Sequence, residues 1–192
     1  MIFRAILAVI CSSLSITTLA EPRMVNAEQF DISGVKLGMT QAQAIAAVTD
    51  NMHVDSSAIS FDPFPQPSVV TKQKEPTYFE VRHGATALRV HLKPQVPFNP
   101  EQTLVVSRIS YQQPWAQQTA VQMKQQALQK YGEPSNGRDS GFLQWCRQPL
   151  DKNVGCHDFF GPKLELTGTE LTLSDPQYRE AINRYRRQRT AS

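Results

Sequence analysis

Short segments in which apolar and polar residues alternate constrain the fold of this chain more than any other feature. Residues 78–82 and 88–92 alternate in this way on either side of Gly84. A period of two is typical of half-buried strands. We therefore expect a hairpin here, with one face in the core and the other in solvent.

A second hairpin near the end of the chain has a register that the sequence nearly determines. A two-residue turn beginning at Gly168 places Leu166 opposite Leu171 and Leu164 opposite Leu173. These leucines are expected to share one apolar face of the two strands.

A further strand is expected between the two hairpins. Val105, Ile109 and Tyr111 recur at even spacing, which predicts that their side chains share the core face. Trp115 and Trp145 are also expected in the core, because large aromatic side chains are mostly buried there.

Helical signals separate the strand segments. Thr40 and Gln43 fit a capping box, Gly132 suits the residue after a helix end, and Ser174 suits the cap before a helix. Helices are therefore expected over residues 40–50, 119–131 and from 174 onward.

The order of helix, strands, helix, strands and helix indicates an α+β fold, with helices on one face of an antiparallel sheet. Two helix-plus-meander repeats, over residues 29–112 and 113–176, would account for this order. We expect residues 21–178 to form a single domain, followed by a basic helix end and tail over residues 179–192.

Residues 1–20 have the pattern of a secretory signal peptide, with an early arginine, an apolar run and a small-residue end. Cleavage is expected after Ala20, with Ala27 as the alternative. The apolar run is shorter than the roughly 20 residues that a membrane-spanning helix needs, and Ile10 before Cys11 is unlike a lipoprotein signal. The pattern predicts a soluble periplasmic or secreted protein.

Export explains the use of cysteine. Signal cleavage leaves Cys146 and Cys156, which we expect to form a structural disulfide in an oxidising compartment. His157 and Asp158 beside them are too few to complete a metal site, so no metal or cofactor is predicted.

Four side chains of the first hairpin are the best candidates for a binding surface: Arg82, Arg89, His91 and Lys93. They would form a cationic patch for an acidic partner, a phosphate or a lipid headgroup, although a merely solvated sheet face gives the same pattern. The formal net charge of +3 comes mainly from arginines of residues 179–192, so it does not predict nucleic-acid binding. These arginines suit a helix C-terminus or a weak contact with anionic lipid.

Two short motifs are similar to those of a group of small exported bacterial proteins. Residues 32–40 combine Gly34, Gly38 and a helix cap, and residues 130–135 follow the second expected helix. They resemble motifs of the helix-plus-meander repeats of β-lactamase inhibitor proteins and of the small lipoprotein of the outer-membrane assembly machinery. The resemblance implies a structural motif and no active site, and this chain lacks the lipid anchor of that lipoprotein.

No catalytic motif is present, since the chain contains no G-x-S-x-G, H-E-x-x-H, P-loop or dinucleotide fingerprint. No catalytic residue is predicted. The leading hypothesis is a binding protein of the bacterial cell envelope whose partner is another envelope protein. The alternatives are a small periplasmic hydrolase with an unrecognised site, and a lipid or small-molecule carrier with an apolar cavity between sheet and helices.

Overall fold

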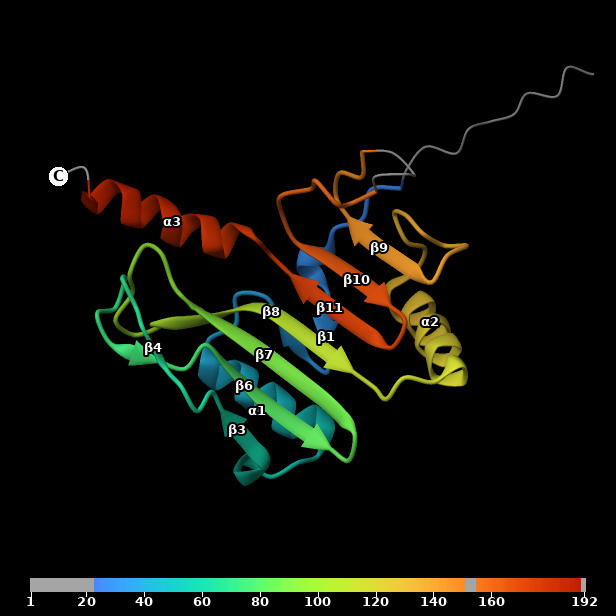
Figure 1. The fold of residues 1–192 in the computed structure, drawn as a ribbon, viewed down its shortest axis with the longest axis horizontal. Coiled ribbons are helices and arrows are strands. Elements are labelled where there is room, and N and C mark those ends of the chain that lie inside the picture. Colours follow the sequence, from blue (N-terminus) through green and yellow to red (C-terminus); the bar gives the residue numbers. More distant parts are fainter. Residues whose placement is uncertain (1–22, 151–154, 191–192) are drawn as a thin grey trace, which may run out of the picture.

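The structure is a computed structural model that describes residues 23–150 and 155–190 (Figure 1). Its centre is a seven-stranded antiparallel sheet. In spatial order its strands are β3 (Ile59–Phe61), β6 (Tyr78–His83), β7 (Thr86–Pro94), β8 (Leu104–Gln112), β11 (Glu170–Ser174), β10 (Lys163–Thr167) and β9 (Phe142–Cys146). The α+β class is confirmed. The expected signal peptide lies outside the described residues.

The remaining elements are three α-helices, two short 3-10 helices and two small hairpins. The helices are α1 (Gln41–Met52), α2 (Gln117–Tyr131), α3 (Gln177–Thr190), η1 (Ala27–Gln29) and η2 (Ser56–Ala58). The small hairpins pair β1 (Asp31–Ile32) with β2 (Val35–Lys36), and β4 (Gln66–Pro67) with β5 (Lys74–Glu75). Within this described part, no helix is long and apolar enough to cross a membrane.

The large sheet consists of two meanders that meet in the middle. One meander consists of β6, β7 and β8, with β3 added at its outer edge, and the other consists of β9, β10 and β11. The last strands of the two meanders, β8 and β11, pair with each other. Across this seam Ile109 pairs with Leu173, and Tyr111 pairs with Leu171. Two helix-plus-meander units joined at their last strands would give this order, but repetition in the sequence stays a prediction.

Both predicted hairpins are present, and the second has the predicted register. Val81 pairs with Leu88 across the turn at Gly84, and Leu166 pairs with Leu171 across the turn at Gly168. Both glycines have positive φ, of 59° and 58°, which a glycine adopts without strain.

The main core lies between the sheet and the helices α1 and α2. Ala44 and Val48 of α1, and Met123 and Ala127 of α2, are buried in the same cluster as the apolar strand residues. The capping box of α1 is confirmed, since the Thr40 hydroxyl accepts from the Gln43 N–H. Figure 1 shows α1 behind β6 and β7, whereas α3 projects away from the layered body and buries none of its residues.

A β-bulge in β8 overturns one prediction. His91 pairs with Arg108 but Leu92 pairs with Val106, so Ser107 is an extra residue on β8. Val106 therefore joins the core cluster, while Val105 lies opposite Lys93 on the other face. The expectation that Val105 shares a face with Ile109 is wrong. The extra residue between them reverses the alternation of faces, so an even spacing no longer places two side chains on the same side.

Two further predictions differ from the structure. Trp145 is buried as expected, but Trp115 is 76% exposed. The third helix begins at Gln177, and Asp175 rather than Ser174 accepts from the Gln177 N–H. Pairing with Arg108 places Ser174 at the end of β11, so the strand extends over the residue that was expected to cap the helix.

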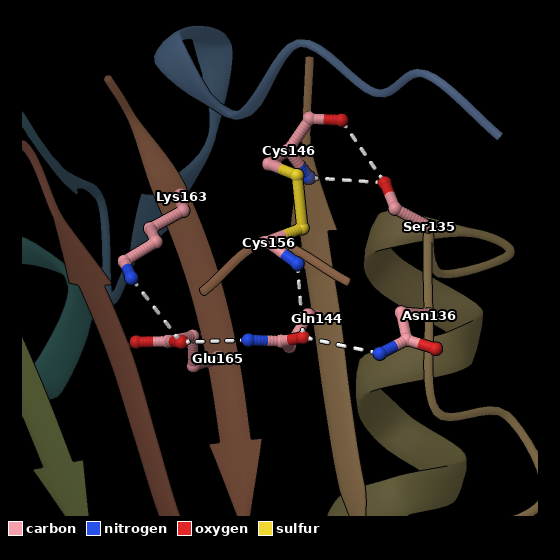
Figure 2. The surroundings of a disulfide bond; sticks show 7 residues. All are labelled: Ser135, Asn136, Gln144, Cys146, Cys156, Lys163 and Glu165. Carbon is pink, nitrogen blue, oxygen red and sulfur yellow. Dashed lines mark hydrogen bonds and ion pairs between the residues drawn. A yellow bond between two sulfur atoms is a disulfide. The ribbon is translucent and has the colours of Figure 1, made fainter. Parts of the chain in front are cut away.

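The disulfide between Cys146 and Cys156 is confirmed, with an S–S distance of 2.07 Å. Figure 2 shows Gln144 beside it, with its Oε1 atom accepting from the Cys156 N–H and from Asn136 Nδ2. Gln144 Nε2 in turn donates to Glu165. The bridge thus fastens the segment at Cys156 to the edge strand β9, where the buried amide of Gln144 is hydrogen-bonded through both its oxygen and its nitrogen.

Candidate binding site on the open sheet face

The face of the large sheet that points away from α1 and α2 is polar. It carries all four residues of the predicted patch, Arg82, Arg89, His91 and Lys93, because their neighbours Val81, Leu88, Val90 and Leu92 point into the core. We call this surface the open face. The sequence thus predicted correctly that the four side chains share one side of the sheet.

The buried carboxylate of Glu80 neutralises part of the positive charge of this patch, which the sequence analysis did not predict. Its side chain is buried on the open face and forms ion pairs with both Arg82 and Arg89. The guanidinium of Arg89 also lies 4.6 Å from the centre of the Tyr78 ring. The signal was present in the hairpin register, which places Glu80 directly opposite Arg89. Arg82 and Arg89 are therefore partly neutralised.

The excess positive charge lies one row further along the strands, around His91. Arg108 is the partner of His91 across β7 and β8, and Arg89 and Lys93 are its neighbours along β7. Burial, and after it the positive charges of Arg108, Arg89 and Lys93, together lower the pKa of His91 from its ordinary 6.5 to about 4. The imidazole is therefore neutral at pH 7 in a positively charged environment.

A hollow of about 560 Å³ adjoins this group. Lys93, Arg108 and Arg179 line it, and Phe159 and Phe160 form part of its wall. A smaller hollow of about 240 Å³, which Phe142 also lines, shares Arg108, Glu165 and Ser174 with the first. The two hollows therefore adjoin each other across β8, β11 and β10, and we call them together the groove.

Four carboxylates also line the groove, those of Asp158, Glu165, Glu170 and Asp175, and two of them are engaged in ion pairs. Glu165 pairs with Lys163 at 3.5 Å and accepts from Gln144, and Glu170 lies 3.9 Å from Arg108. Burial raises the pKa of Asp175, and the charge of Glu28 raises it further. These contacts leave Lys93 and Arg179 with no ion pair in the part of the chain that the structure describes.

Small hydroxyl side chains of β10 and β11 line the groove: those of Thr167, Thr172 and Ser174. Ser110 Oγ and Thr172 Oγ1 lie 3.4 Å apart on neighbouring strands, and Arg108 Nε donates to Ser110 Oγ at 3.3 Å. Short side chains beside long cationic ones allow a partner chain to approach the sheet closely. This arrangement can bind charged and hydrogen-bonding groups.

A metal site finds no support in residues 23–150 and 155–190, which hold no cluster of three or more His, Cys, Asp or Glu side chains. Cys146 and Cys156 are joined in the disulfide, so neither offers a thiolate nucleophile.

No protein-family model, curated protein sequence or solved structure matches this chain. The resemblance to helix-plus-meander proteins stays a prediction, and the site is described from its geometry alone.

Proposed function

We propose that this protein is an exported binding protein whose open face holds an acidic segment of another cell-envelope protein. The observation that carries the proposal is the group of Arg89, Lys93 and Arg108 around His91, where all the charges that shift the His91 pKa are positive. Charge complementarity of this kind steers and selects a partner.

The shape of the surface supports a protein partner. The groove runs across the seam of the sheet, and Phe142 and Phe160 are exposed aromatic side chains along it. Exposed aromatic residues beside arginines are typical of protein interfaces. An extended acidic segment along the groove would contact the cations, the hydroxyl side chains and the aromatic rim together.

Export from the cytoplasm is part of the proposal. The Cys146–Cys156 bond is compatible with an oxidising compartment. The signal pattern of residues 1–20 adds a sequence argument for the periplasm or the cell exterior.

The test places a photo-crosslinking amino acid at Ser110, whose hydroxyl lies 3.4 Å from that of Thr172 in the wall of the groove, and a control crosslinker at the exposed Gln125 of α2. We expect one envelope protein to crosslink at position 110 alone, through a peptide rich in Asp and Glu. Arg108→Glu should abolish this product, whereas Lys74→Glu in β5 should retain it. A crosslinked peptide without acidic residues, or a product unchanged by Arg108→Glu, would refute the proposal.

A further inference from the structure

A second cavity lies on the opposite side of the sheet, between α1 and α2, so an inference about it is independent of the proposed function. Its volume is about 480 Å³. Tyr111, Leu166 and Leu171, whose side chains share the core face at the seam between the meanders, form its floor. Met52 of α1 and Met123 of α2 line it from the two helices.

The apolar part of this cavity suits a flexible chain. Its floor and walls are mainly leucine, methionine and tyrosine side chains, and methionine adapts its shape to an irregular apolar ligand. The volume is roughly three times that of a 150 Å³ cavity that holds one benzene molecule. By that scale it has room for a chain of about twelve carbon atoms.

Lys130 supplies a positive charge to the lining of this cavity, beside the polar side chains of Ser33, Thr86 and Gln126. No carboxylate is among the lining residues. Lys130 Nζ lies 2.7 Å from Asp31 Oδ1, but its side chain is about half exposed and an ammonium group has three N–H donors. It can therefore hold Asp31 and the headgroup of a ligand at the same time.

We propose that this cavity binds a single-chain anionic amphiphile of the fatty-acid type. The alkyl chain lies over Tyr111, Leu166 and Leu171, between the two methionines. The carboxylate lies at the rim and accepts hydrogen bonds from Lys130 and from other polar groups there. The protein would then join a charged surface on one face of the sheet to an amphiphile site on the other.

The test measures binding of laurate to the purified, disulfide-bonded protein by calorimetry below the micellar concentration. Gln126 and Gln125 are neighbouring exposed residues of α2, but only Gln126 lines the cavity. We expect saturable binding of one laurate per chain. Gln126→Trp should weaken it by about tenfold or more, which is about 1.4 kcal/mol, whereas Gln125→Trp should not.

The headgroup is tested separately with dodecanol, which has the same chain and no charge. Laurate should bind more tightly than dodecanol, and Lys130→Gln should remove most of that difference while Lys130→Arg retains it. Absence of saturable laurate binding, or equal binding by the Gln126→Trp and Gln125→Trp variants, would overturn the proposed site. Equal affinity for laurate and dodecanol would overturn the anionic headgroup.

Discussion

Glu80 balances the charges of the open face, because its buried carboxylate serves two arginines at once. We predict that Glu80→Gln lowers the free energy of unfolding by about 1 kcal/mol, since Arg82 and Arg89 lose a charged acceptor but remain partly solvated. Urea unfolding measures this loss. Glu101→Gln, in an exposed loop, is the matched control and should leave the stability unchanged. A Glu80→Gln variant as stable as the wild type would contradict the prediction.

The depressed pKa of His91 predicts a pH dependence of stability. The native pKa is about 4 and the ordinary value is 6.5, so between these values the unfolded chain binds a proton that the native protein does not. Stability from this group is complete above pH 6.5 and is lost as the pH falls toward 4. Because the ring is partly exposed, we expect a loss of about 1 to 2 kcal/mol rather than the full value of the shift.

Unfolding of the wild type and of His91→Gln at pH 7 and pH 4.5 measures this contribution as the difference between the two losses. An NMR titration of the His91 ring gives the same answer directly. If the His91 signal titrates near pH 6.5, burial and the surrounding cations do not lower the pKa of His91, and the prediction is wrong.

At the residue scale, the candidate site was only partly predictable. Alternation is enough to place Arg82, Arg89, His91 and Lys93 on one face, and the hairpin register then brings Glu80 opposite Arg89. The contribution of Arg108 depends on the pairing of β8 with β7, which brings Arg108 opposite His91. The pairing of β8 with its neighbours is a long-range contact, so local sequence does not specify it.

At the scale of elements, the disulfide is expected to stabilise the attachment of the Cys156 segment to β9. Replacing Cys146 and Cys156 together by alanine should lower the free energy of unfolding by about 2 to 3 kcal/mol, because the bond restricts the conformational freedom of the unfolded chain. The variant also no longer holds the Cys156 N–H in place as a donor to Gln144. A reducing agent should cause a similar loss in the wild type and none in the double variant. A double variant that unfolds at the wild-type denaturant concentration would exclude a structural role.

Elements with local signals were predicted closely, and those that depend on tertiary context were not. The capping box of Thr40 and the glycine turns are encoded in a few neighbouring residues. The start of α3 is not, since pairing of Ser174 with Arg108 continues β11 and leaves Asp175 to cap the helix. Trp115 lies outside the core because β8 ends at Gln112 and the chain leaves the sheet there. The composition of the sequence does not show where a strand ends.

On the scale of the whole molecule, the seam between the meanders connects the two surfaces for which we propose ligands. Ser110 and Thr172 lie on the open face, where Thr172 lines the groove, while Tyr111 and Leu171 line the cavity between the helices. Alternation along two adjacent strands thus places a charged site and an apolar site on opposite sides of one layer.

The same seam predicts that both meanders unfold as one cooperative unit. Ile109 and Leu173 are buried and paired across it, so separating the meanders would expose core from both. Native-state hydrogen exchange should give β7, β8, β10 and β11 the same highest opening free energy. The amides of α3, which buries no residue, should exchange through local openings of much lower free energy. Two distinct opening energies for the two meanders would show that each is stable alone, and the single-domain interpretation would then fail.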